Sequence, residues 1–266
     1  MGGLKVLCIA IVLINGQTIG TVAADGPFPD EARRMRSANE FLSPALRAEQ
    51  ADPIRNRGML WVEQGERLFA QPPPPGGAQS CASCHASPET SMRGVAARLP
   101  AVDAESGQLV NLEGRINDCR ILRQSLPPLD YETDELLALT AYLTALSIGE
   151  PLTVSIDGPA SAFYAYGQQL WSERQGQLNV ACTQCHDQSV GRKLRGDTIS
   201  SAVPTGYPAY RLEWQTLGSL HRRLRSCQLG VRAQLFELGS REYLALELYL
   251  KSRARRHLID APALRR

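Results

Sequence analysis

The chain has 266 residues, of which 43% are hydrophobic and 21% charged, with a formal net charge of +2. This composition is typical of a globular protein, and the length fits one large or two small domains. The near-neutral charge argues against a nucleic-acid-binding protein, which would carry a basic face. No apolar stretch reaches the roughly 18 residues that a membrane span requires.

The first 24 residues have the pattern of a secretory signal peptide. Lys5 precedes an apolar run over residues 6–14, and small residues lead to Ala24, after which we expect cleavage. A buried N-terminal strand is the alternative interpretation. Export would place the mature chain in the periplasm, an oxidising compartment, and would remove Cys8 with the signal peptide. The charged segment 25–59 predicts a helical extension, which either packs over the domains or binds a partner.

Two complete C-x-x-C-H motifs, Cys81–His85 and Cys182–His186, predict the attachment of two c-type haems. Two thiols at this spacing can add to both vinyl groups of one haem, and the adjacent imidazole then reaches the iron. The predicted covalent attachment residues are Cys81, Cys84, Cys182 and Cys185, and the predicted axial imidazoles are His85 and His186. A zinc site would need a further Cys or His pair, whereas His221 and His257 stand alone.

The two motifs lie inside an internal repeat. Gly65–Phe69 matches Gly167–Trp171 at an offset of 102, the haem motifs are offset by 101, and Thr133–Leu143 matches Ser240–Leu250 at an offset of 107. In the last pair, hydroxyl N-caps and acidic first turns predict helix starts, and leucines at helical spacing predict an amphipathic helix. Each half is therefore expected to run as helix, haem motif, long loop and closing helix.

This order resembles the class I cytochrome c domain, whose first and last helices cross beside the haem. The predicted fold is mainly α, with two tandem class I cytochrome c-like domains and an N-terminal helical extension. We expect a signal peptide over 1–24, the extension over 25–59, the first haem domain over 60–150 and the second over 151–266, with a break near 149–158. The basic C-terminal tail predicts a solvated helix end or a docking patch for an acidic partner.

The sixth iron ligand distinguishes kinds of cytochrome. Electron-transfer cytochromes c usually place Met opposite His, but no Met follows residue 92, and Met92 is only seven residues past His85. Cys119 and Cys227 occupy equivalent positions in the two sixth-ligand loops, so we expect thiolate ligation at both irons. A disulfide between them is the alternative in an exported protein. His221 is a competing ligand for the second haem, or else a group near it or on the surface.

Several arginines surround the second of these cysteines. Arg223 precedes Cys227 by four residues and would share its helix face, where a guanidinium would lower the thiol pKa and could bind an oxyanion. Solvation or pairing with haem propionates is the ordinary fate of such arginines. Arg115 stands in the same relation to Cys119, so spacing alone does not make Arg223 catalytic.

Together these residues resemble the SoxA family, the dihaem subunits of the SoxAX cytochromes of bacterial sulfur oxidation. The resemblance spans about Gly65 to Leu250, and its most specific part is Trp214 to Ala233. It implies an L-cysteine S-thiosulfotransferase that joins thiosulfate to a cysteine of the carrier SoxYZ and passes two electrons to c-type cytochromes, first to a monohaem SoxX partner. It further implies that Cys227 is the catalytic thiolate, isolated as a persulfide, that Arg223 binds substrate, and that Cys119 is an axial ligand.

Three other functions remain as alternatives. A plain dihaem electron-transfer cytochrome would need neither Cys ligands nor an adjacent arginine. A thiosulfate dehydrogenase forming tetrathionate would commonly combine a Cys-ligated haem with a Met-ligated one, which the methionine positions do not favour. A dihaem peroxidase would need an open iron position.

Overall fold

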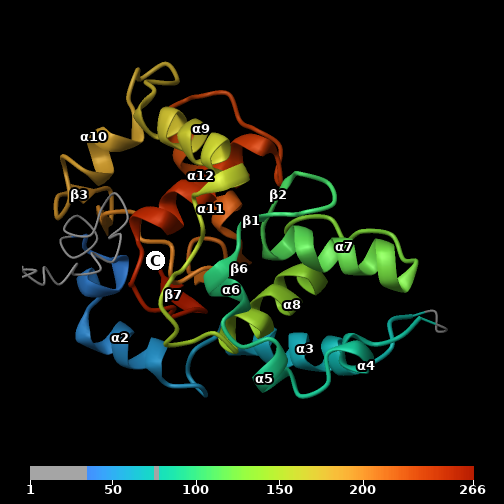
Figure 1. The fold of residues 1–266 in the computed structure, drawn as a ribbon. Helices are drawn as coiled ribbons and strands as arrows, with labels where there is room; N and C mark the ends of the chain where they lie inside the picture. Colours follow the sequence, from blue (N-terminus) through green and yellow to red (C-terminus); the bar gives the residue numbers. More distant parts are fainter. Residues whose placement is uncertain (1–34, 75–77) are drawn as a thin grey trace, which may run out of the picture.

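Helices dominate the computed structural model, which describes residues 35–74 and 78–266 (Figure 1). The mainly α fold class is confirmed. The predicted signal peptide, 1–24, and the start of the predicted extension, 25–34, lie outside the described residues. Within the described ranges, no helix has both the length and the apolar character needed to cross a membrane.

The first half is built on two crossing helices, α3 (Met59–Ala70) and α8 (Asp134–Ala145). The connecting chain forms α4 (Cys81–Cys84), α5 (Pro88–Ser91), α6 (Val95–Arg98), the hairpin strands β1 (Ala101–Val102) and β2 (Leu109–Val110), and α7 (Leu112–Gln124). The closing helix α8 begins after Thr133 as predicted, but the Thr133 hydroxyl donates to the Asp130 carbonyl instead of capping the helix. Residues 136–144 are all buried, so α8 is not amphipathic as predicted, because neighbours cover it on every side.

The second half repeats the arrangement with α9 (Ser161–Ser172) crossing α12 (Arg241–Arg253). The elements between and around these helices are η2 (Gly158–Ala160), α10 (Cys182–His186), β3 (Lys193–Leu194), β4 (Asp197–Thr198), β5 (Ala209–Arg211), β6 (Thr216–Gly218), α11 (Leu220–Gly230) and β7 (Ala263–Arg265). Here the Ser240 side chain does cap its helix, accepting a hydrogen bond from the Tyr243 N–H. Helix α12 is also buried along most of its length, from Tyr243 to Arg253.

Each helix crossing contains a glycine at the point of closest approach, and the internal repeat keeps this glycine in both halves. A Cβ on Gly65 would overlap the Ala138 carbonyl of α8, and a Cβ on Gly167 would overlap the equivalent Ala245 carbonyl of α12. The helices can therefore approach this closely only because a side chain is lacking on one of them. The same offset of 107 relates the two contacted alanines, so the sequence repeat is also a structural one.

Replacing Gly167 by alanine is expected to destabilise the protein by about 1–3 kcal/mol, because the added methyl group must push α9 away from α12. Gly230→Ala is the matched control, since nothing lies within 4 Å of a Cβ at that position. Thermal unfolding of the haem-loaded protein measures both. Equal unfolding temperatures for the two variants would mean that the crossing tolerates a side chain.

The N-terminal segment packs on the second half of the chain. It forms η1 (Ala38–Phe41) and α2 (Pro44–Ala51), and the Gln50 side chain accepts hydrogen bonds from the Leu264 N–H at 3.1 Å and from the Arg265 guanidinium. Residues 263–265 form β7, which pairs in parallel with β5 in a sheet of order β6-β5-β7. In the described part of the chain, the extension is thus a cover over the C-terminal sheet.

The basic tail is only in part the solvated helix end that its charges predict, since some of its arginines are enclosed. The Arg253 side chain is 3% exposed and lies 2.6 Å from Asp187 Oδ1, directly after the second haem motif. Arg265 is largely enclosed between β5 and the extension. Arg253 and Arg265 fold inward because carboxylate and amide acceptors from distant segments meet them there, whereas Arg256 and Arg266 are exposed.

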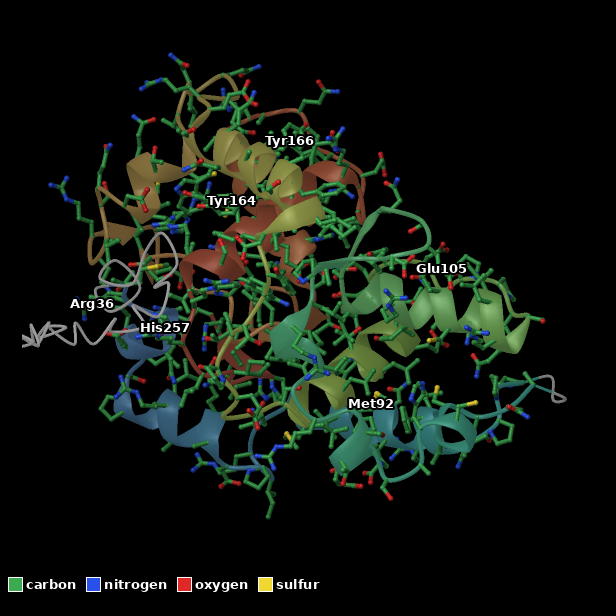
Figure 2. All side chains as sticks on the ribbon, in the orientation of Figure 1. Arg36, Met92, Glu105, Tyr164, Tyr166 and His257 are labelled. Carbon is green, nitrogen blue, oxygen red and sulfur yellow. The ribbon has the colours of Figure 1, made fainter. Side chains whose placement is uncertain are left out.

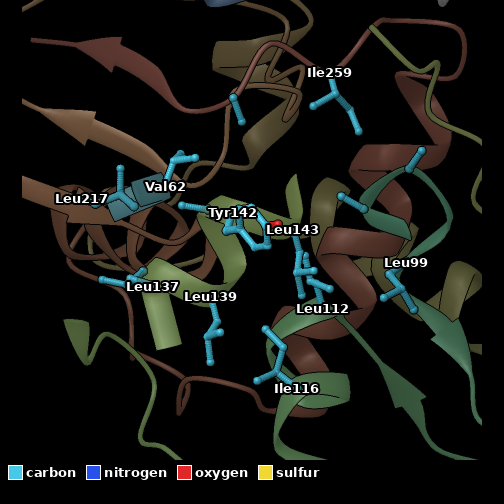
Figure 3. Close-up of a cluster of buried hydrophobic side chains, with 14 of the residues drawn as sticks. Val62, Leu99, Leu112, Ile116, Leu137, Leu139, Tyr142, Leu143, Leu217 and Ile259 are labelled. Atoms are coloured by element: carbon cyan, nitrogen blue, oxygen red, sulfur yellow. The ribbon is translucent and has the colours of Figure 1, made fainter. Parts of the chain in front are cut away.

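The hydrophobic core connects the two halves, since the largest of its clusters contains buried residues from both. Its largest cluster joins Leu137 and Tyr142 of α8 to Leu217 of β6 and to Ile259 beyond α12 (Figure 3). The predicted break at 149–158 is a packed segment, in which Leu152 is buried and its N–H donates to the His257 carbonyl at 3.1 Å. The haem motifs are therefore held on a continuous body.

Candidate haem sites

The first haem motif sits at the outer end of α3. The Ser80 hydroxyl caps α4 by accepting the Ser83 N–H at 3.2 Å, which places Cys81 and Cys84 one turn apart with His85 at the helix end. Cys119, in the middle of α7, lies beside this turn. Burial raises the pKa of the Cys81 thiol, and the proximity of Cys119 raises it further. The structure thus brings the predicted attachment and axial residues of the first half together.

The second motif forms α10, and Cys227 of α11 faces it. Burial raises the pKa of Cys182 to about 12, with the neighbouring Cys227 as the next cause. His186 lies within hydrogen-bonding reach of the Cys227 thiol. Its Nδ1 is 2.7 Å from the Ser200 carbonyl oxygen, so Nδ1 carries the ring proton and Nε2 is left as the basic nitrogen. Iron-bound histidines are typically held in this way by a second hydrogen bond, so the donor set fits a haem.

Aromatic rings support both imidazoles in the same manner. The Phe69 ring of α3 lies 6.4 Å from the His85 ring, and the Trp171 ring of α9 lies 5.7 Å from the His186 ring, measured between centroids. Trp171 also donates its indole N–H to Asp187 Oδ2 at 3.1 Å. The internal repeat therefore extends to the ring packing against each predicted iron ligand.

The Cys227 thiol has an unusual electrostatic setting. Burial by itself raises its pKa, but the hydrogen bond with His186 and the positive charge of Arg223 outweigh burial and lower the pKa from 9.0 to about 7. In the first half, burial instead leaves the pKa of Cys119 raised. The two equivalent cysteines thus differ, and Cys227 loses its proton more readily than Cys119 to give the thiolate.

The arginines four residues before each cysteine also differ. Arg115 lies 3.0 Å from Asp103 Oδ2 and 3.7 Å from Asp118 Oδ2, and hydrogen bonds from Ser106 and Arg115 lower the pKa of Asp103 to about 2. Arg223 makes no ion pair with any residue in the described part of the chain. Its guanidinium therefore remains available to an anion that approaches Cys227.

The alternatives for the sixth ligand have clear outcomes in the structure. The six cysteines in the described ranges are free, so Cys119 and Cys227 form no disulfide. His221 is only 1% exposed, and its Nδ1 accepts the Gly239 N–H while Nε2 faces Glu247, so neither ring nitrogen is directed to an iron. Met92 packs against the core of the first half, next to α5 (Figure 2).

One contributor to the second site is absent from the sequence-based prediction. Arg211, on the central strand β5, is buried and also lowers the pKa of Cys227. Its guanidinium is held by Asp197 at 3.1 Å and Glu213 at 3.0 Å. The only sequence signal was an arginine between apolar residues of a short strand, 16 positions before the cysteine, and strand pairing rather than helix spacing places it there.

The chain matches the family model described as SoxA/TsdA, cytochrome c domain, over residues 64–152 and 166–259. It is 32% identical over 256 residues to the L-cysteine S-thiosulfotransferase subunit SoxA of Rhodovulum sulfidophilum, covering 96% of this chain and 89% of that protein. The corresponding subunit of Pseudaminobacter salicylatoxidans is 35% identical over 226 residues, covering 85% and 79%. The chain belongs to the SoxA family.

A solved structure supports this membership. The crystal structure of SoxXA from P. pantotrophus superposes with a TM-score of 0.80 at 30% sequence identity, covering 86% of each chain. The two segments of the SoxA/TsdA model each contain one C-x-x-C-H motif and one of the two further cysteines. The predicted resemblance to the SoxA family is therefore confirmed, and with it the cytochrome c nature of the chain.

Proposed function

We propose that this chain is the dihaem catalytic subunit of a periplasmic L-cysteine S-thiosulfotransferase. One haem c is held by Cys81 and Cys84 in the half spanning 60–150, and a second by Cys182 and Cys185 in the half spanning 151–266. His85 with Cys119, and His186 with Cys227, would supply the axial ligands of the two irons. A SoxX-like monohaem cytochrome c is the partner, in line with the similarity to the crystal structure of SoxXA.

The reaction joins thiosulfate to a cysteine of a SoxYZ-like carrier. Carrier-SH and S₂O₃²⁻ give carrier-S-SSO₃⁻, one proton and two electrons, so a sulfur–sulfur bond forms as two electrons leave for c-type cytochromes. When bound, each haem supplies one-electron redox chemistry. Because a single such centre accepts one electron, the two-electron step needs a further acceptor, which the SoxX-like haem provides.

Residues of the second half do the chemistry on sulfur. Cys227 is the catalytic thiolate. It would take up thiosulfate as Cys227-S-SSO₃⁻ while two electrons leave, and the carrier thiolate would then displace the Cys227 thiolate and keep the S-SO₃⁻ group, which divides the reaction into two easier steps. Arg223 binds the thiosulfate dianion through paired N–H donors. Arg211 adds positive charge, and the His186 ring is held in place by its hydrogen bond to the Ser200 carbonyl.

A single observation supports placing the sulfur chemistry in the second half and not in the first. Arg223 acts on Cys227 without an acidic partner in the described chain, whereas the equivalent Arg115 is neutralised by two carboxylates. An unpaired, partly buried guanidinium beside a thiolate is a suitable site for a small divalent sulfur anion. The first half lacks that property, so its haem is assigned no part in binding the substrate.

The haem-loaded protein, incubated with a SoxX-like cytochrome, the carrier and thiosulfate, is expected to add one S₂O₃ unit to the carrier cysteine. Mass spectrometry of the intact carrier measures the addition, and optical spectra record the reduction of the haems. Tetrathionate formation with an unmodified carrier would identify a thiosulfate dehydrogenase instead. Haem reduction by generic donors without any thiosulfate consumption would identify an electron-transfer cytochrome.

A further inference from the structure

The two helices that carry the further cysteines begin at one buried place between the halves. Glu113 lies in the first turn of α7, six residues before Cys119, and His221 lies in the first turn of α11, six residues before Cys227. Six residues of α-helix correspond to about 9 Å along the axis. This meeting point is therefore about equally close, along the helices, to both predicted sulfur ligands.

Glu247 of α12 is the centre of the contacts at this place. Its carboxylate lies 3.0 Å from Lys251 Nζ, 3.2 Å from His221 Nε2, and accepts a hydrogen bond of 3.1 Å from the Asn111 amide. His221 Nδ1 accepts the Gly239 N–H, so the ring N–H that faces this carboxylate is the one on Nε2. Burial raises the pKa of Glu247, but Lys251 and His221 outweigh it and lower the pKa to about 2.

Glu113 is a second buried carboxyl group at this place, and its charge is not matched by a positive charge of its own. The titratable and charged groups that face it are Glu247 and Lys251 from α12, His221 from α11 and Tyr131 from the segment before α8. The positive charge of Lys251 is already matched by Glu247, so a second buried carboxylate would be uncompensated. Burial, followed by repulsion from Glu247, raises the pKa of Glu113 to about 7.

A small cavity makes this carboxyl group reachable by protons. Its volume is about 30 Å³, and its lining includes Glu113, Glu247, Lys251 and Thr140. The buried Thr140 hydroxyl oxygen makes no hydrogen bond within the described residues. This volume admits one or two water molecules with several polar partners. Lys251, which lines the cavity, keeps 13% of its side chain exposed.

We propose that Glu113 is a proton-exchange site between the two haem domains, which takes up one proton when a neighbouring haem iron is reduced and releases it on reoxidation. The inference rests on the proposed haems and adds to them. In the step, iron(III) gains an electron supplied by thiosulfate oxidation, and the Glu113 carboxylate gains a proton from solvent through the cavity. Charges about 10 Å apart in a protein interact strongly enough to couple the two events.

Two measurements on the haem-loaded protein test this proposal. Reduction is expected to produce the infrared C=O stretch of a protonated carboxylic acid, and Glu113→Gln is expected to remove that band. The midpoint potential of at least one haem is expected to fall as pH rises through about 7, and this dependence should be lost in Glu113→Gln. Glu105→Gln, an exposed glutamate on the β1–β2 hairpin (Figure 2), is the matched control and should behave as the parent protein.

The possible outcomes are distinguishable. Potentials that do not change with pH, or that change equally in Glu113→Gln, would overturn the proposal. If Glu113→Gln does not fold, the parent protein still decides, because the absence of a carboxylic acid band on reduction refutes the role of Glu113. Haem content and axial ligation, recorded on the same samples, report on the proposed haems separately, so a failure there is not mistaken for a failure of proton exchange.

Discussion

Replacing Cys227 by alanine is expected to lower the rate of thiosulfate conjugation by at least about 10³-fold, as for loss of an enzymatic nucleophile. The physical reason is that the variant lacks the sulfur on which the covalent intermediate forms. Both haems should stay attached, because Cys182 and Cys185 supply the thioether bonds. Carrier modification by mass spectrometry measures the rate, and low-temperature EPR should show one low-spin, thiolate-type signal lost or shifted.

Cys119→Ala is the matched comparison, since it removes the equivalent sulfur of the first half. We expect it to change the EPR signal of the other haem while carrier modification persists. Conjugation that survives in Cys227→Ala would contradict the catalytic role of Cys227. EPR signals that change in neither variant would mean that neither cysteine binds an iron.

Local spacing predicted most of what surrounds the two haem sites. The C-x-x-C-H motifs, the helices α3 and α9 before them and the closing helices α8 and α12 all appear where the repeat places them. Such features depend on residues within a few helical turns of one another, so they are visible in a sequence. The crossing glycines are a further example, because the sequence repeat alone pairs Gly65 with Gly167.

The contacts between distant segments were not predictable in the same way. Glu113 and Glu247 are separated by more than 130 positions, and their pairing across the two halves has no local pattern. His221 was expected near the haem or on the surface, yet it stacks on Tyr131 with ring centroids 5.7 Å apart, inside the interface. Burial and charge compensation at such places are set by tertiary packing, which only the three-dimensional structure shows.

The repeat also shows where the two halves differ around the cysteines to which we assign different roles. The backbone plan is the same, with α7 and α11 each capped by a side chain, Asn111 and Ser219, and each carrying a cysteine in the middle. Besides the hydrogen bond between His186 and Cys227, the halves differ in the partner of one arginine. Asp103 and Asp118 hold Arg115, whereas no carboxylate in the described chain forms an ion pair with Arg223, on which Asp197 and Glu213 act only at longer range. The proposed binding of thiosulfate at Arg223 therefore rests on the absence of an ion pair as much as on the arginine itself.

Arg223→Ala is accordingly expected to lower kcat/KM for thiosulfate by about 10²-fold, with haem content unchanged. A charged hydrogen bond contributes about 1.5–3 kcal/mol, so losing the paired donors to one substrate oxyanion accounts for a change of this size. The kcat/KM of Arg223→Lys should lie between those of the parent protein and Arg223→Ala, because lysine keeps the charge but lacks the planar pair of donors. Steady-state conjugation kinetics at varied thiosulfate concentration measure these effects.

The repeat supplies the control for this experiment as well. Arg115→Ala removes the same side chain from the same helix position of the first half, where two carboxylates already neutralise it. We expect its kcat/KM to stay within about twofold of the parent value, as for a surface ion pair. Equal losses in Arg115→Ala and Arg223→Ala would show that both arginines act through structure. A loss confined to Arg223→Ala would mean that the free guanidinium beside Cys227 receives the anion.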